Sequence, residues 1–207
     1  MEDHYKLSFT AVSLGLSESL VIAETYLSTG DWERTKERVK EKNLLQARVS
    51  SSVQRMYQEV EPRLQTLSEG QMHFLVEEAN LNEQKQMLWY MICKRYSFIR
   101  DFAAEVLFRR VQLLHTDLQE YDYTVFFNEK ADWHDELRNL KETTQVKIRT
   151  VLFRMLREAD FLTTENQIIP CILSPAVVNQ IEIDVPWSLT IYPTQINLIK
   201  EGEHGTT

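Results

Sequence analysis

The sequence predicts a mainly α-helical protein made of two small helical subdomains and a short extended C-terminal tail. Good helix formers, chiefly Leu, Glu, Gln, Arg and Lys, dominate the first 160 residues. Only 5 glycines and 5 prolines occur among the 207 residues, which argues against a fold rich in β-strands and turns. Apolar side chains recur at intervals of three and four over several stretches, which is the spacing of one face of an amphipathic helix.

An N-terminal helical subdomain is predicted over residues 1–79. Its first helix ends at Gly30, and the side chain of Asp31 is suited to cap the next helix. Pro62 either kinks the third helix or begins a new one. Ser68 begins a capping-box sequence, which favours a further short helix. The helices expected in this part cover residues 14–29, 32–42, 48–67 and 68–79.

A second helical subdomain is predicted over residues 80–182, beginning at a polar junction over 80–84. Residues 166–173 are apolar and partly β-branched, which favours a short strand there. Ser174 and Pro175 form a good cap and first-turn pair for a last helix. The remaining segments are expected to be helices over 84–114, 122–130, 143–160 and 175–182, a turn or short helix over 133–140, and an extended tail over 183–207.

The composition is typical of a cytoplasmic protein without a membrane span. Hydrophobic residues make up 43% of the chain and charged residues 26%, which is ordinary for a globular domain. The two cysteines, Cys93 and Cys171, are far apart and surrounded by apolar residues, so a reducing compartment is the simple interpretation. Neither a signal peptide nor an apolar run long enough to cross a bilayer is apparent.

Catalytic and metal-binding motifs are absent from the sequence. The five glycines are isolated, so they form no phosphate-binding loop, and the five histidines are far apart. His134 is either a partly buried histidine or a metal or acid–base residue, and the first is the more ordinary case. Cys93 lies in an apolar helix and is expected to be a packed thiol. We therefore expect no enzyme activity, no cofactor and no bound metal.

Positive charge is concentrated in three parts of an acidic chain. The formal net charge is −8, yet residues 34–48, 85–114 and 141–157 each carry a net charge of +4. A protein with this distribution can present a basic patch to a polyanion despite its acidic average. The alternative for each basic segment is a solvated helix face.

The strongest basic row lies on the helix predicted over 143–160. Lys147, Arg154 and Arg157 fall within roughly a quarter turn of one another at about 100° per residue. They lie opposite an apolar face, with only Glu158 close by. Three cations on one sector attract phosphates, so this row is the first candidate for contacts with a duplex backbone.

Two further pairs of cations form a second group of candidates. Arg48 and Arg55 share a helix face with Glu59, which predicts either a row of phosphate contacts or an internal row of ion pairs. Lys94 and Arg100 project away from the apolar stripe of the 84–114 stretch. Arg95 and Arg110 fall within that stripe, and we expect Arg95 to pair with a carboxylate or to reach a surface between the subdomains.

Several longer phrases of the sequence resemble one protein family. The phrases are Leu7-Ser8-Phe9-Thr10-Ala11; Asn43-Leu44-Leu45-Gln46-Ala47-Arg48 followed by Ser51-Ser52; Leu88-Trp89 through Cys93-Lys94-Arg95-Tyr96 into Asp101-Phe102-Ala103-Ala104-Glu105-Val106-Leu107; and Lys130-Ala131-Asp132-Trp133-His134 through Val151-Leu152-Phe153-Arg154-Met155-Leu156-Arg157-Glu158-Ala159. In this order they resemble the BrxA family, accessory proteins of the BREX bacteriophage-exclusion systems, over roughly residues 7 to 175.

The resemblance implies a small helical protein with two helical parts and a fold similar to the antitermination factor NusB. It also implies DNA binding and work beside other BREX components, namely the methyltransferase and ATPases. It supplies no catalytic residues and no residue-by-residue list of DNA contacts, so the candidate contacts rest on helix geometry.

Together these observations predict a non-catalytic protein that binds duplex DNA through phosphates. The candidate contacts are Lys147, Arg154, Arg157, Arg48, Arg55, Lys94 and Arg100. A protein–protein adaptor within the defence complex and an RNA-binding protein are the alternatives. The sequence does not specify an oligomeric state.

Overall fold

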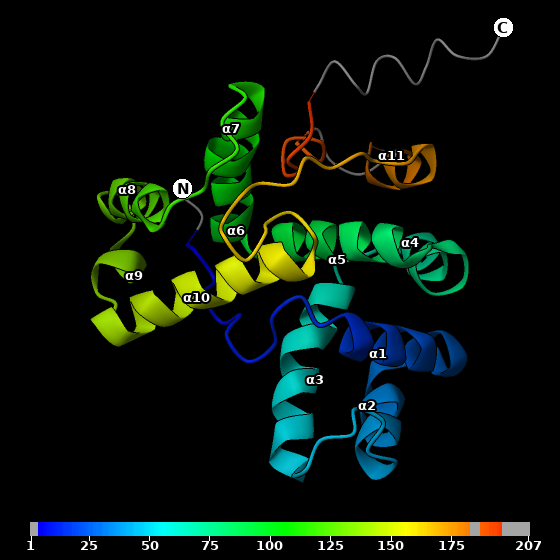
Figure 1. The fold of residues 1–207 in the computed structure, drawn as a ribbon. Helices are drawn as coiled ribbons and strands as arrows, with labels where there is room; N and C mark the ends of the chain where they lie inside the picture. Colours follow the sequence, from blue (N-terminus) through cyan, green and yellow to red (C-terminus); the bar gives the residue numbers. More distant parts are fainter. Residues whose placement is uncertain (1–3, 183–186, 196–207) are drawn as a thin grey trace, which may run out of the picture.

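The computed structural model describes residues 4–182 and 187–195 of the chain. The regular elements of these residues are helical (Figure 1), so the predicted mainly α-helical class is confirmed. In chain order they are α1 (Leu16–Thr29), α2 (Trp32–Glu41), α3 (Ser50–Leu64), α4 (Glu69–His73), the π-helical turn η1 (Phe74–Glu78), α5 (Leu81–Arg95), α6 (Ser97–Phe102), the π-helical turn η2 (Ala103–Phe108), α7 (Arg109–Gln112), α8 (Glu120–Ala131), α9 (Asp135–Arg138), α10 (Glu142–Glu158) and α11 (Pro175–Glu182).

Several helix ends are formed by the residues that the sequence indicates. Gly30 ends α1 with φ of 65°, a left-handed conformation that glycine adopts without strain. The Asp31 side chain accepts a hydrogen bond from the backbone N–H of Arg34 and so caps α2. Ser68 and Gln71 form the predicted capping box. Pro62 lies inside α3 without ending it.

The helical stretch predicted over 84–114 is divided at Tyr96, so its interpretation as one continuous stretch is corrected. Tyr96 leaves the helical region with φ of −122° and ψ of 94°, and Figure 1 shows α6 and α7 running at a steep angle to α5. Its ring is buried against Phe9, and its hydroxyl donates to the carbonyl of Ser8 at 3.2 Å. The change of helix direction at Tyr96 accompanies the tertiary packing of its ring. Helix periodicity does not predict such a change.

The segment predicted as a strand over 166–173 forms only isolated β-bridges in the described structure. Gln167 pairs with Asp117, and Ile168 pairs with Leu162. An edge strand needs a longer run of paired residues, and the loop instead bonds to several separate elements. The expected strand is therefore replaced by a loop that is anchored at single points.

The described part of the predicted tail, residues 187–195, turns and packs against α5 and α7 rather than extending from the protein. Tyr192 is fully buried, and its hydroxyl donates to the carbonyl of Gln86 at 2.9 Å. Trp89 Nε1 donates to the carbonyl of Ile191 at 2.8 Å. Residues 183–186 and 196–207 of the predicted tail lie outside the described residues.

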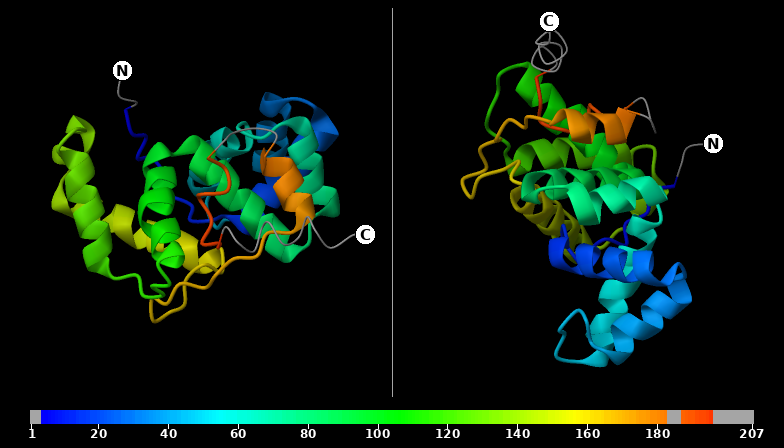
Figure 2. Two further views of the ribbon diagram at one scale, coloured as in Figure 1. Left: turned by 90° about the horizontal axis from the view of Figure 1, so that it is seen from above. Right: turned by 90° about the vertical axis from the view of Figure 1, so that its right-hand side faces the viewer.

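A continuous hydrophobic core runs through both predicted subdomains. It includes Val53 and Val60 of α3 as well as Trp89 of α5 and Leu152 of α10. Figure 2 shows α2 and the adjoining end of α3 projecting from the rest of the molecule. The boundary predicted between residues 79 and 80 coincides with the N-cap of α5, Asn80. The division into two subdomains stays a prediction.

Candidate nucleic-acid interface

Helices α3 and α10 lie at an angle to each other and form two sides of a corner, with the N-terminal segment passing between them (Figure 1). We call residues 4–15, which precede α1, the strap. A cleft of about 540 Å³ lies in this corner. It is lined by residues 11–18, by Met56 of α3, by Lys85 of α5, and by Arg154 and Glu158 at the C-terminal end of α10, with Asp160 just beyond. The cleft shows that α3 and α10 contribute to one surface.

The α10 wall of this corner carries Lys147 and Arg154. The apolar face of α10, including Ile148, Leu152 and Met155, is buried, while Lys147 and Arg154 are exposed. They are seven residues apart, which places them on one stripe about 10 Å apart along the helix axis. Neither forms an ion pair with any residue that the structure describes. Their charges are therefore available to a ligand.

The α3 wall carries Arg48, just before the helix, and Arg55 within it. Both side chains are exposed. Arg55 immediately precedes Met56, which lines the cleft together with Arg154. Within the described ranges, neither Arg48 nor Arg55 has a carboxylate partner. Of these four cations Arg154 lines the cleft and Arg55 adjoins its lining residue Met56, whereas Arg48 and Lys147 lie further along the same two walls.

The two carboxylates closest to these cations in the helical pattern bind the strap instead. Glu59 accepts hydrogen bonds from the backbone N–H groups of Ala11 at 2.8 Å and Val12 at 2.9 Å, and it pairs with the buried Arg63. Glu158 has the corresponding role on α10. The alternative in which Arg48 and Arg55 belong to an internal row of ion pairs with Glu59 is therefore not what the structure has.

Glu158 accepts hydrogen bonds from the Ser13 hydroxyl at 2.7 Å and from the backbone N–H of Leu14 at 2.8 Å. Sequence reasoning missed the hydrogen bonds that Glu59 and Glu158 form with the strap. One signal was available, because Glu59 and Arg63 lie four residues apart within the apolar stripe of α3, where ionised side chains need partners.

Arg157 differs from its two neighbours in the predicted row. Its side chain is half-buried and stacks on the ring of Phe153, with 6.0 Å between guanidinium carbon and ring centroid. Its Nη2 donates to the Asn166 side chain at 2.6 Å, and its Nε donates to the carbonyl of Thr163 at 3.4 Å. These contacts hold the loop after α10, so Arg157 is less available to phosphates than Lys147 or Arg154.

Lys94 and Arg100 are also half-buried, and both side chains contact neighbouring residues. Lys94 Nζ lies 5.3 Å from the ring centroid of Tyr90. Arg100 donates to Asp101 at 3.1 Å and stacks over the indole of Trp187. These contacts tie Lys94 to α5, and Arg100 to α6 and to Trp187 of the tail.

The two arginines predicted within the apolar stripe of 84–114 have different surroundings. Arg110 pairs with Asp117 and Asp122. Arg95 is half-buried, and its Nε has no hydrogen-bond partner among the described residues. Among the described residues, Arg110 has carboxylate partners and Arg95 has none; the other expectation for Arg95, that it reaches a surface between the subdomains, stays a prediction.

His134 packs against the strap. Its ring stacks on Tyr5 with centroids 4.0 Å apart, and its Nδ1 lies 3.1 Å from Glu136 Oε1. The Tyr5 backbone N–H also donates to Glu136 at 2.6 Å, and the Tyr5 hydroxyl donates to Asp101 at 2.8 Å. Of the two interpretations that the sequence allows for His134, these contacts fit the more ordinary one, a partly buried histidine.

The cysteines have the surroundings expected of packed thiols. Both are free and buried, and burial raises the pKa of Cys93 above its ordinary value and that of Cys171 to about 12. In the described ranges, no group of three or more acidic, histidine or cysteine side chains is arranged to hold a metal ion. Nor does any described helix combine the length and apolar character that crossing a bilayer requires.

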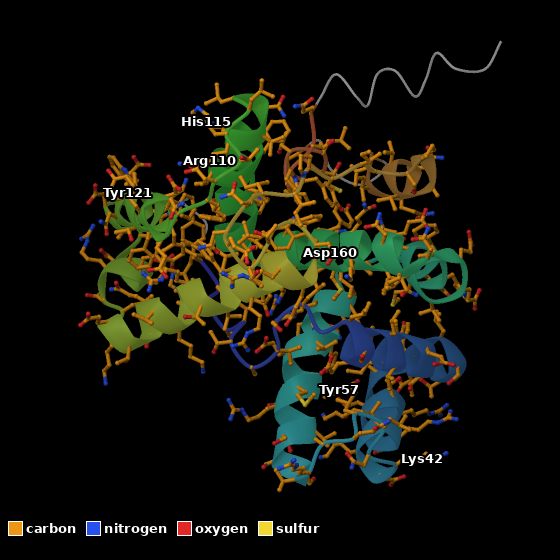
Figure 3. The ribbon with its side chains drawn as sticks, in the orientation of Figure 1. Lys42, Tyr57, Arg110, His115, Tyr121 and Asp160 are labelled. Carbon is orange, nitrogen blue, oxygen red and sulfur yellow. The ribbon has the colours of Figure 1, made fainter. Side chains whose placement is uncertain are left out.

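A second cleft, of about 410 Å³, lies between α7 and α8, and its lining includes Arg110, His115 and Tyr121. Figure 3 places these three residues at the opposite side of the molecule from Tyr57 of α3 and Lys42, just past the end of α2. Arg110 is held there by Asp117 and Asp122. This cleft is therefore separate from the α3–α10 corner and contributes no free cation row to it.

Comparison with known proteins identifies the family to which this helical chain belongs. The model of the BrxA family matches residues 3–184. The chain therefore belongs to the BrxA family of the BREX phage-exclusion systems, which confirms the resemblance seen in the sequence.

Two individual proteins are also similar to this chain. The BREX protein BrxA of Escherichia coli O9:H4 (strain HS) is 26% identical over 150 residues, which are 72% of this chain and 70% of that protein. The crystal structure of an uncharacterized protein from Magnetospirillum magneticum superimposes with a TM-score of 0.77 at 18% identity. It covers 92% of this chain and 99% of its own, and this likeness concerns the fold alone.

Proposed function

We propose that this BrxA-family protein is a non-catalytic accessory factor that binds duplex DNA in the cytoplasm through the α3–α10 corner. The proposal rests on the different surroundings of the cations and the carboxylates on these two helices. Arg48, Arg55, Lys147 and Arg154 are exposed, whereas Glu59 and Glu158 bind the strap. These four exposed cations give an acidic protein positive charge on both helices of the corner, beside a cleft that Glu18, Glu158 and Asp160 also line, and exposed cations of this kind suit a polyanionic ligand.

The binding is proposed to depend on phosphates and not on base sequence. Flexible Lys and Arg side chains on helix faces provide contacts with phosphates, and such contacts carry no sequence information. Each phosphate contact contributes about 0.9 to the slope of log affinity against log salt. Four contacts give a slope of about 3.6, so affinity falls about 150-fold between 50 and 200 mM salt.

A salt titration with unrelated duplexes tests the proposal. Arg154→Gln should lower the slope by about 0.9 on every duplex. Arg109→Gln is the matched control, because Arg109 is also an exposed arginine on a helix, but in α7. Affinity that barely changes with salt, or equal losses in the two variants, would contradict the proposed interface.

The protein–protein adaptor remains the second candidate, supported by family membership in a multicomponent defence system. Copurification with other BREX components after nuclease treatment, combined with no duplex binding, would favour it. Competition between duplex DNA and RNA of equal length distinguishes the third candidate, an RNA-binding protein.

A further inference from the structure

Four consecutive strap residues are hydrogen-bonded to the two walls of the corner, the first two to α3 and the next two to α10. The N–H groups of Ala11 and Val12 donate to Glu59 of α3. The next two residues, Ser13 and Leu14, donate to Glu158 of α10 through a hydroxyl and an N–H. The strap is therefore a polar connection between α3 and α10.

Arg63 strengthens the α3 side of this connection. Its guanidinium is fully buried and donates to the carbonyls of Val12 at 2.8 Å and Ser13 at 2.7 Å. Val12 thus has both the donor and the acceptor of its backbone satisfied by side chains. Such a segment has little freedom to move relative to α3.

The strap also has a backbone geometry that only glycine suits at its end. Gly15 has φ of +70°, and a Cβ atom there would lie 2.5 Å from Cγ1 of Val12. The chain therefore turns tightly into α1 directly after the residues that bind Glu158. Helices α3 and α10 themselves make no extensive contact with each other.

We propose that Glu59 and Glu158 are positioning residues. By forming hydrogen bonds with the strap that lies between the two cationic walls, they fix the separation of these walls. This inference rests on the proposed function, because the separation matters only if both walls bind one duplex. Walls held at a fixed separation engage phosphates together without a further ordering cost. Walls that move independently bind as two weaker sites.

Whether removal of the Glu158 carboxylate strengthens or weakens duplex binding distinguishes a positioning role from a purely electrostatic effect. Removing a carboxylate beside a cationic surface should strengthen binding of a polyanion. Glu158→Ala should instead weaken duplex binding by about tenfold or more and lower the salt slope from about 3.6 towards about 1.8, the value for one wall. Glu24→Ala, which removes an exposed carboxylate from α1, is the matched control and should not weaken binding.

A distance measurement without DNA gives an independent readout. Spin labels on cysteines introduced at Gln58 of α3 and Thr150 of α10, both exposed, report the separation of the walls. The native cysteines are buried and are not expected to react. Glu158→Ala should broaden the distance distribution, whereas Glu24→Ala should leave it unchanged.

The outcomes of these experiments test the proposed function and the positioning role separately. If the unmodified chain binds no duplex, the proposed function fails and this inference fails with it. If the chain binds but Glu158→Ala binds equally or more tightly, with an unchanged distance distribution, the positioning role is wrong while the proposed function stands. Should Glu158→Ala not fold, Ser13→Ala removes one of the two bonds to Glu158 and should give a smaller change in the same direction.

Discussion

Replacing Arg63 by methionine should destabilise the protein by about 3–5 kcal/mol, because breaking a buried ion pair leaves its partner charge uncompensated. Arg63 is fully buried and pairs with Glu59, which is itself buried. It also donates to the carbonyls of Val12 and Ser13, and methionine supplies no donor for them. Its guanidinium lies 5.5 Å from the ring centroid of Tyr96, so packing is lost as well.

The expected loss is large relative to a typical folding stability of about 5–15 kcal/mol. For a chain of this size, each 1 kcal/mol shifts the melting temperature by about 2–4 °C, so Arg63→Met should melt about 6–20 °C lower. Denaturant unfolding monitored by circular dichroism measures the free energy of unfolding directly. Arg55→Met is the control, since Arg55 is exposed on the same helix and its loss should stay within about 0.5 kcal/mol.

A similar loss in Arg63→Met and Arg55→Met would refute the reasoning. It would mean that the buried guanidinium does not hold the strap against α3. A changed denaturant slope would instead indicate that the mutation alters the unfolded state or the two-state behaviour, so the comparison requires equal slopes.

Three further predictions concern Gly15, the two buried cysteines and Glu136. Gly15→Ala should cost more than Gly30→Ala in denaturant unfolding, and more than about 1–2 kcal/mol. Both glycines have positive φ, but only at Gly15 would the Cβ atom meet a neighbour below 3 Å. Cys93 and Cys171 should react with a thiol reagent at pH 8 far more slowly than in denaturant, because burial raises the pKa of both. Equal rates would contradict their burial. Burial alone would raise the pKa of Glu136, but hydrogen bonds from backbone N–H groups and His134 lower it below its ordinary value. Its stabilising contribution is therefore present above the unfolded-state pKa and lost as pH falls through the folded-state pKa. Acid unfolding should be less steep in Glu136→Gln, and an identical pH profile would show that Glu136 does not contribute.

Most of the helices could be predicted from local signals. Gly30, Asp31 and the Ser68 capping box act within one turn of the chain, so their effects are visible in the sequence. The break at Tyr96 could not be predicted in this way. It accompanies packing of its ring against Phe9, a residue far away in sequence.

Part of the candidate site could also be predicted from local signals. Helix periodicity places Lys147 and Arg154 on one stripe, and the structure has both exposed. Periodicity cannot report what a neighbouring carboxylate binds, and Glu59 and Glu158 bind the strap from helices far apart in the chain. The engagement of Arg157 with Asn166 likewise depends on a loop conformation that the sequence pattern does not define.

The central claim is that cations of α3 and α10 bind one duplex together. The most direct test neutralises the α3 pair (Arg48 and Arg55), the α10 pair (Lys147 and Arg154), and then all four, and measures the salt slope of duplex binding for each variant. Each pair should lower the slope by about 1.8, and the fourfold change should abolish nearly all salt-dependent binding. Duplex binding by the fourfold variant with the affinity and slope of the unmodified chain would contradict the account.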